Sequence, residues 1–430
     1  MQPQLVNGID DTTNQRSNVL MAWIVGFAAS LFFFYEFILG NMFASIADDI
    51  MRDFHIQADK MAYLSSIHYL SNVIFLLVAG QILDRYSAKK TIIFAMILCV
   101  VSTFLLASSQ SFYVALFCRF LTGIGSAFCF LGPMRIVSRW FPPKKMALVT
   151  GAVVTMAMTG GLLSQYPLTK LVLQFGWRES LVFVGWLGMA LLVMMVVWIK
   201  NQPKGYQFET DQNKSVIEVA KQAYFNPQTF RAAMFTSLMN MAVAVFGAMM
   251  GSLYLMQRLG VGKEQAAMVN SMLFLGAIFG GPIIGWCSDR LGKRILPMKI
   301  GLIASFVVIM AILLLPVSLN VMTVLFFLLG FFTASQVISY ALVAESSPPA
   351  MTATALSLIS ILTQGGYIIY QNLFSHLLIW HGGVTFVNDA PVYSFGDYQT
   401  AALMIPIGLI VAWVAIGKLK ETHCQQIQKG

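Results

Sequence analysis

The chain contains twelve long apolar runs, and these limit the folds it can adopt more than any other feature. About 20 consecutive apolar residues cross a bilayer as a helix. Runs of this kind lie at 20–47, 61–83, 91–108, 112–137, 147–173 and 181–199, and again at 232–256, 266–286, 297–316, 321–344, 353–378 and 398–417. Only 10% of the 430 residues are charged, against roughly 25% in soluble domains. The sequence therefore predicts an all-α membrane protein with twelve transmembrane helices.

Two similar polar loops interrupt these runs, one in each half of the chain. Both read Gly-x-x-x-Asp-Arg followed by a basic cluster: Gly80, Asp84 and Arg85 in the first copy, and Gly285, Asp289 and Arg290 in the second. A Pro-Pro pair follows each loop at nearly the same distance, at 142–143 and 348–349. Landmarks that recur at one offset indicate a duplicated unit. We therefore predict two pseudo-symmetric bundles of six helices each.

The polar stretches set the domain boundaries. We predict a cytoplasmic tail (1–19), an N-terminal six-helix bundle (20–199), a cytoplasmic linker (200–230), a C-terminal six-helix bundle (231–417) and a disordered cytoplasmic tail (418–430). The first twenty residues are polar, so no cleavable signal peptide is expected. With both termini in the cytoplasm, most of the 27 lysines and arginines fall on that side, as the positive-inside rule requires. The net charge of +9 thus orients the chain in a membrane, and no nucleic-acid partner is predicted.

Ionisable residues inside the apolar runs are the strongest functional candidates, because a charge in the hydrocarbon layer costs a few kcal/mol. Four lie in the first half: Glu36, His68, Arg119 and Arg135. At about 1.5 Å per helical residue, the first three fall at one level, slightly outside the midplane, where they can face one cavity. The alternative is a buried Glu36–Arg119 ion pair that only locks two helices. Arg135 lies nearer the cytoplasm, where it either holds an anionic group or extends to lipid headgroups.

Neutral hydrogen-bonding residues make up the rest of the predicted cavity. The first half offers Tyr35, Tyr69 and Gln165, and the second offers Asn240, Gln336, Tyr340 and Gln364. Some of these side chains are expected to be interface tyrosines or amides that pair helices. As a set, they predict a polar site with charge on one wall and amide or phenol groups on the other.

These motifs resemble those of the major facilitator superfamily. The doubled loop is similar to the signature between helices 2 and 3 of that superfamily and its echo between helices 8 and 9, although Ser87 and Ala88 depart from the pattern. Arg119-Phe-Leu-Thr-Gly123-Ile-Gly125 is similar to the superfamily's helix-4 pattern. The resemblance implies that Arg119 takes part in substrate binding or proton coupling.

The resemblance also assigns a conformational role to the two loops, which in this family close the cytoplasmic side. Asp84 and Asp289 are expected to cap neighbouring helices, and Arg85 and Arg290 to pair with acids at helix ends. Glu345 is the candidate partner in the second half. Together with Gly80 and Gly285, these residues form the predicted gate.

The function expected from these observations is secondary transport by alternating access. Glu36 and His68 are the mid-span groups that change protonation most readily, which favours proton coupling. Phe34-Tyr-Glu-Phe37 and Phe175-Gly-Trp-Arg178 look like segments of the bacterial phagosomal nutrient transporters, a group related to lysosomal dipeptide carriers. That resemblance implies uptake of an amino acid, a short peptide or a similar zwitterion across a bacterial inner membrane. Organic-anion or sugar-phosphate transport is the alternative, and a siderophore chelate stays open.

Other classes of protein fit less well. A membrane enzyme would need a cluster such as HExxH or GxSxG, and a receptor or scaffold would need a large soluble domain. The sequence shows neither of these, nor a CxxC pattern among its five cysteines. We therefore predict no catalytic residue, metal site or cofactor, and a monomer would suffice because one chain holds both bundles.

Overall fold

The computed structural model describes residues 7–141, 145–201, 226–347, 352–382, 385–387 and 390–425. Both Pro-Pro pairs and most of the predicted linker lie outside these residues. The described helices of the first half are α1 (Asn7–Asn41), α2 (Phe43–Asp53), α3 (Ala58–Arg85), α4 (Ala88–Ser108), α5 (Phe112–Ser126), α6 (Leu131–Trp140), α7 (Met146–Leu163) and α8 (Tyr166–Trp198).

The second half is helical except for one hairpin. Its elements are α10 (Pro227–Met239), the π-helix η2 (Val243–Met250), α11 (Gly251–Leu259), α12 (Lys263–Leu291), α13 (Ile295–Leu314), α14 (Leu319–Thr333), the 3-10 helix η3 (Ala334–Val337), α15 (Ile338–Ser346), α16 (Thr352–Gly382), α17 (Phe395–Ala402) and α18 (Met404–Gly417). The strands β1 (Thr385–Val387) and β2 (Ala390–Val392) pair antiparallel, with Phe386 opposite Pro391.

Most of the predicted membrane crossings are found in the described chain. Nine of its helices are long and apolar enough to span a bilayer, and the bent pair Pro227–Met239 with Val243–Leu259 makes a tenth. The 51-residue stretch Leu148–Trp198 has a kink at Gly176, where φ is 80°, and is long enough for the two crossings that the sequence predicts there. The 31-residue α16 is also long enough to cross a bilayer.

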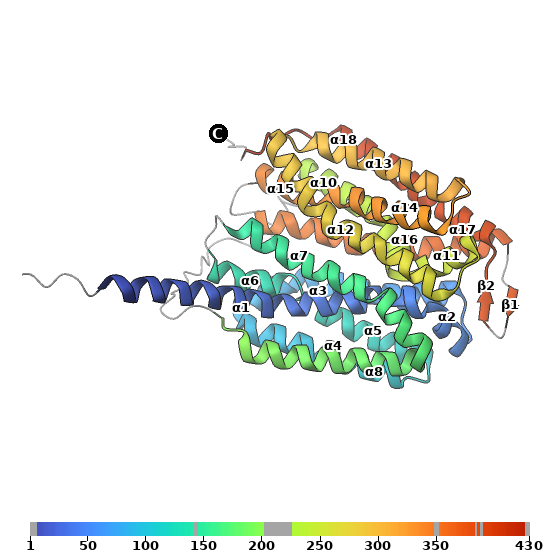
Figure 1. The fold of residues 1–430 in the computed structure, drawn as a ribbon, viewed down its shortest axis with the longest axis horizontal. Coiled ribbons are helices and arrows are strands. Elements are labelled where there is room, and N and C mark those ends of the chain that lie inside the picture. The colour runs from blue at the N-terminus through green and yellow to red at the C-terminus, as the bar shows by residue number, and fades with distance from the viewer. Residues whose placement is uncertain are drawn as a thin grey trace, which may run out of the picture.

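The two halves meet chiefly through α3 against α16 and α7 against α12. The start of α1 and the end of α18 lie at one end of the molecule, and the β1–β2 hairpin lies at the other (Figure 1). We call these the terminal end and the hairpin end. At the hairpin end the halves are tied together: Lys263 Nζ lies 2.6 Å from Asp48 Oδ1 and 2.5 Å from Asp49 Oδ2. The Tyr393 hydroxyl also accepts a hydrogen bond of 3.0 Å from the Ala58 amide.

The glycines of the same helices differ between the two ends. A Cβ added at Gly80, Gly151, Gly281 or Gly285, toward the terminal end, would meet no described atom within 4 Å. Nearer the hairpin end, a Cβ at Gly161 would lie 2.5 Å from the Phe274 ring, which belongs to the other half. The halves are therefore in contact nearer the hairpin end, whereas these four glycines face open space. Tight packing explains only some of the glycines in these helices.

The C-terminal tail is ordered as far as Gln425, contrary to the expectation of disorder. Gln228 Nε2 donates to the Lys420 carbonyl at 2.8 Å, and Arg231 Nη1 donates to the Lys418 carbonyl at 3.1 Å. The tail is polar, as its composition shows. It is nevertheless ordered, because polar side chains of α10 donate hydrogen bonds to its backbone carbonyls. Residues 426–430 lie outside the described chain.

Candidate functional site

Three ionisable side chains lie together in the first half, as the depth argument predicted. Glu36 is on α1, His68 on α3 and Arg119 on α5, and their exposed fractions are 4%, 2% and 0%. His68 Nε2 lies 3.0 Å from Glu36 Oε1. On the opposite side of the carboxylate, Cys99 Sγ lies 3.7 Å from Glu36 Oε2. We call Glu36, His68 and Arg119 the charged cluster.

Arg119 does not form the ion pair that the sequence left open as an alternative. Its Nη1 donates to the Leu39 carbonyl at 3.0 Å, and its guanidinium lies 4.7 Å from the centre of the Phe43 ring. Within the described residues, Nε and Nη2 of Arg119 have no hydrogen-bond partner. Because an unpartnered buried donor is costly, these two nitrogens mark the place where an additional acceptor would be stabilised.

Close helix packing brings the cluster together. A Cβ at Gly123 of α5 would lie 2.2 Å from the His68 carbonyl, and one at Gly125 would lie 2.5 Å from Cys99 Sγ. These glycines let α5 approach α3 and α4 at backbone distance. The Gly pair that follows Arg119 in the sequence therefore sets how near the guanidinium comes to His68 and Glu36.

Of the two tyrosines predicted in the first half, Tyr69 joins the cluster and Tyr35 donates instead to a residue of α4. The Tyr69 hydroxyl donates to the Gly40 carbonyl at 2.9 Å, and its ring lies 5.0 Å from that of His68. On its other side, the Tyr69 ring lies 4.7 Å from Tyr367 of α16, which connects the cluster to the second half. The Tyr35 hydroxyl donates to Thr103 at 3.2 Å on α4.

The second half places two of its four predicted polar residues at helix breaks. Asn240 follows the end of α10, and Gln336 lies in η3. The two amides are hydrogen-bonded to each other, with Gln336 Nε2 donating to Asn240 Oδ1 at 3.0 Å. Tyr340 and Gln364 are half-buried on α15 and α16, and Arg135 is half-buried on α6. Discontinuous membrane helices often carry groups that bind ions or small molecules.

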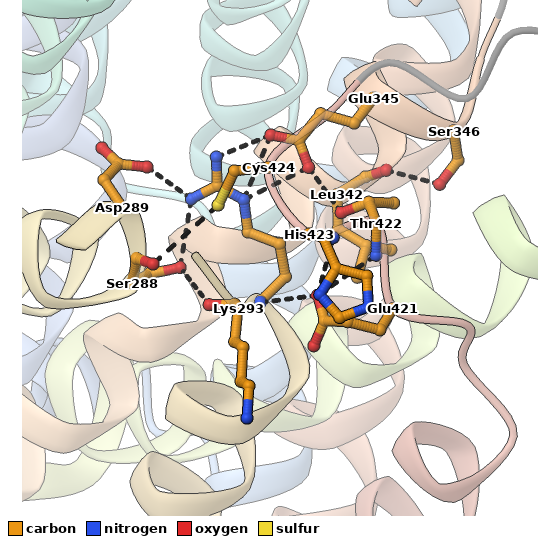
Figure 2. A network of polar contacts seen from close by, with 11 residues as sticks. Ser288, Asp289, Lys293, Leu342, Glu345, Ser346, Glu421, Thr422, His423 and Cys424 are labelled. Carbon is orange, nitrogen blue, oxygen red and sulfur yellow. Dashed lines mark hydrogen bonds and ion pairs between the residues drawn. The ribbon is translucent and has the colours of Figure 1, made fainter. Parts of the chain in front are cut away.

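The predicted gate in the second half is built around a residue that the sequence analysis did not select. Arg294 donates to Glu345 Oε1 at 2.6 Å and to Asp289 Oδ1 at 2.6 Å (Figure 2). Arg290, the predicted partner of Glu345, instead lies with its guanidinium 5.3 Å from the Trp286 ring. That prediction was wrong because Arg290 is the last but one residue of α12 and points outward, whereas Arg294 follows the turn at Gly292. The basic pair Lys293-Arg294 at the end of the motif was the sequence feature that could have identified Arg294 as the partner of Glu345.

The tail completes this network. Glu421 accepts hydrogen bonds from the backbone amides of Arg294 at 2.7 Å and Ile295 at 2.9 Å. The Thr422 hydroxyl donates to Glu345 at 2.5 Å (Figure 2). Although burial opposes it, these amide donors hold the pKa of Glu421 below its ordinary value. Glu421 thus caps the N-terminus of α13, a position where a carboxylate is favoured.

In the first loop, two polar side chains cap the start of α4. The N-cap of α4 is Ser87, whose side chain accepts from the Lys90 amide, and Asn201 accepts from the Lys89 amide at 2.9 Å. The capping role of Asp84 stays a prediction, because its side chain lies outside the described part of the chain. Arg85 is exposed.

The sequence profile of the Major Facilitator Superfamily matches residues 22–370 and 232–422. The chain therefore belongs to the major facilitator superfamily and is an integral, multi-pass membrane protein. This is a family of transport proteins, so the hypothesis of a membrane enzyme is not retained.

The chain is similar to known transport proteins over part of its length. It is 24% identical over 257 residues to the hexuronate transporter of Bacillus subtilis, which corresponds to 57% of this chain and 59% of that protein. It is 25% identical over 348 residues to the probable galactarate/D-glucarate transporter of Escherichia coli, covering 71% of this chain and 75% of that protein. The chain thus spans little more than half the length of the hexuronate transporter.

Solved structures confirm the fold. A bacterial homologue of the human lysosomal transporter Spinster, solved in an inward-facing and unoccupied conformation, superposes with a TM-score of 0.71 at 18% identity. The match covers 92% of this chain and 96% of that one. At this identity the similarity concerns the fold alone.

Proposed function

We propose that the protein is a secondary transporter that carries a small organic anion, such as a sugar acid, by alternating access. The observation that carries this proposal is the guanidinium of Arg119, buried with two nitrogens that lack a described partner, next to the buried Glu36–His68 pair. A carboxylate satisfies such a guanidinium with paired, charge-assisted hydrogen bonds. The two named relatives transport hexuronate and, as a probable function, galactarate and D-glucarate.

The arrangement of charges favours an anion over the zwitterion that the sequence resemblance implied. A zwitterion needs a free carboxylate for its ammonium group, but His68 lies against Glu36 Oε1 and Cys99 against Oε2. Within the described residues, the cluster atoms without a hydrogen-bond partner are Nε and Nη2 of Arg119, Nδ1 of His68 and Oε1 of Glu36. Two of these four atoms belong to the guanidinium, which favours a carboxylate as its ligand. An amino acid or short peptide remains the second candidate, favoured by the presence of a carboxylate in the same cluster.

The opposite packing at the two ends supports alternating access. The hairpin end is sealed by contacts of Lys263 with Asp48 and Asp49, while Gly80 and Gly285 at the terminal end face open space. Glycine at these motif positions is explained if the halves approach there in another state. With both termini in the cytoplasm, as we propose, the structure is open toward the cytoplasm.

Proton coupling is proposed for the Glu36–His68 pair. Both side chains are buried and 3.0 Å apart, so adding or removing one proton changes the charge beside Arg119. Coulomb interactions are strong in such a low-dielectric environment. A protonation change is therefore able to alter how strongly Arg119 holds an anion. Action as a monomer in a bacterial inner membrane is part of the same proposal.

A ligand screen tests the class of substrate. The purified protein in detergent is heated with a panel of hexuronates, aldarates, aromatic acids, sugar phosphates, amino acids and dipeptides. A bound ligand at about 100 times its Kd stabilises the folded state by roughly 2.7 kcal/mol, which a thermal-shift assay detects. We expect stabilisation by at least one monovalent or divalent organic anion. Stabilisation by amino acids or dipeptides alone would support the second candidate and reject the first.

A further inference from the structure

The C-terminus of α1 connects the charged cluster to the seal at the hairpin end. Three consecutive carbonyls at this terminus each accept a hydrogen bond from a side chain on a different element. Arg119 of α5 donates to Leu39 O at 3.0 Å, Tyr69 of α3 donates to Gly40 O at 2.9 Å, and Gln165 donates to Asn41 O at 3.2 Å. The last carbonyls of a helix have no partner within it and carry the negative end of its dipole.

Gln165 belongs to the seal rather than to the cluster. It follows α7, is fully buried and lies at the boundary between the two halves. Its Nε2 also donates to the Gly247 carbonyl of η2 at 2.9 Å, and its Oε1 accepts from Asn270 of α12 at 2.7 Å. Asn270 in turn donates to the Phe246 carbonyl at 3.0 Å. We call Gln165, Asn270 and the two η2 carbonyls the amide seal.

Two glycines and the π-helix η2 allow the backbone to come close enough for these contacts. A Cβ at Gly160 of α7 would lie 2.1 Å from the Phe34 carbonyl, so α7 approaches α1 at backbone distance. A Cβ at Gly251 would lie 2.4 Å from Asn270 Oδ1. The π-helix widens the backbone where Gly247 and Phe246 present their carbonyls, a feature often found at functional sites. Each element of the seal is thus shaped to hold the Gln165–Asn270 pair.

We propose that the end of α1 transmits the state of the charged cluster to the amide seal, with Gln165 as the positioning residue that receives it. Glu36 lies five residues before Asn41 on the same helix, a rise of about 7.5 Å. When the hydrogen bond from Arg119 to Leu39 O or from Tyr69 to Gly40 O is weakened or broken, the end of α1 shifts. The adjacent Asn41 carbonyl moves with it. Gln165 then loses or regains its position between Asn41 O and Gly247 O. The inference rests on the proposed alternating access and names the coupling between the binding site and the closed end.

The experiment measures amide hydrogen exchange in η2 (Val243–Met250) of the full-length protein by mass spectrometry, with no ligand required. Glu36→Gln alters the cluster and Gln165→Leu removes the receiving amide. The control is Gln371→Leu, which removes another fully buried amide whose donor bond, to Ala244 O at 3.0 Å, stays within the second half. Gln165→Asn, which keeps the amide on a shorter side chain, serves if Gln165→Leu does not fold.

We expect Glu36→Gln to change η2 exchange by roughly tenfold, the scale of one or two net hydrogen bonds. That change should vanish in the Gln165 variants and persist in Gln371→Leu. An undiminished effect of Glu36→Gln in the Gln165 variants would overturn the proposal, and so would the absence of any effect in the wild-type background. Either result leaves the proposed transport function standing if the ligand screen still finds an anion, so the two failures are distinguishable.

Discussion

At the residue scale, each buried polar group of the site has a role that depends on its neighbours. Glu36 contacts His68 and Cys99, so a second group that itself titrates lies beside its carboxylate. Arg119 is held by a carbonyl and an aromatic ring and keeps two donors unused within the described residues. We propose that the cluster combines an anion-binding group, Arg119, with a separate pair, Glu36 and His68, that exchanges protons.

Glu36→Gln should abolish accumulation driven by a pH gradient and spare exchange of substrate for substrate, because glutamine stays neutral throughout the cycle. The measurement is uptake and counterflow of the anion found by the ligand screen in proteoliposomes. Glu179→Gln, which changes an exposed carboxylate on α8, is the control. Proton-driven accumulation that survives in Glu36→Gln would exclude this carboxylate from coupling.

Glu421→Gln should lower thermal stability at neutral pH, and the difference from wild type should shrink in acid. The pKa of Glu421 is below its ordinary value of 4.5 in the folded protein. Its stabilising effect is therefore complete above the ordinary value and is lost as the pH falls through the folded value. Melting temperatures of both proteins across this range provide the check. A difference that does not depend on pH would contradict the capping role.

At the element scale, the spans were predictable and their interruptions were not. Hydropathy located the apolar spans because the bilayer fixes their length, but it missed that α1 begins at Asn7, within the predicted tail. It carried no sign of the breaks near residues 127–130, Asn240 or Gln336, because an average over a long window does not change where a helix is interrupted inside an apolar run. The ordering of the tail by Glu421 and Thr422 was missed because it depends on tertiary contacts that no local pattern encodes.

Two glycines of α12 have opposite surroundings. One packs against a neighbouring helix, and the other faces open space. A Cβ at Gly276 would lie 2.0 Å from the Phe327 carbonyl, whereas one at Gly281 meets no described atom within 4 Å. Gly276→Val should therefore lower stability by about 1–3 kcal/mol, and Gly281→Val should cost much less. Thermal unfolding of both variants in detergent gives the comparison. Equal losses would show that α12 and α14 are not in backbone contact there.

At the scale of the whole molecule, the doubled motif predicted two bundles, and the difference between their ends came only from the structure. The depth argument gave the common level of Glu36, His68 and Arg119 but could not give their directions around the helix axes. It therefore predicted that these residues lie close together, but not which of them form hydrogen bonds or ion pairs with each other. The same limit explains why Arg290 was chosen in place of Arg294.

Gly285→Trp should leave this state stable and block transport, because the added ring fits the open terminal end but obstructs its closure. Gly417→Trp is the matched control: its Cβ also meets no described atom within 4 Å, but it ends α18, away from the partner half. Uptake into proteoliposomes and melting temperature are measured for both. Normal uptake by Gly285→Trp would argue against closure at this end.

The most direct test of the central claim is the dissociation constant of the anion identified by the screen, measured by calorimetry for wild type and Arg119→Gln. Charge-assisted hydrogen bonds contribute about 1.5–3 kcal/mol, so we predict roughly 10- to 150-fold weaker binding in the variant. Arg258→Gln, which removes an arginine bonded to Leu315 O at the protein surface, should bind as wild type does. Equal affinity in Arg119→Gln and wild type would contradict the account.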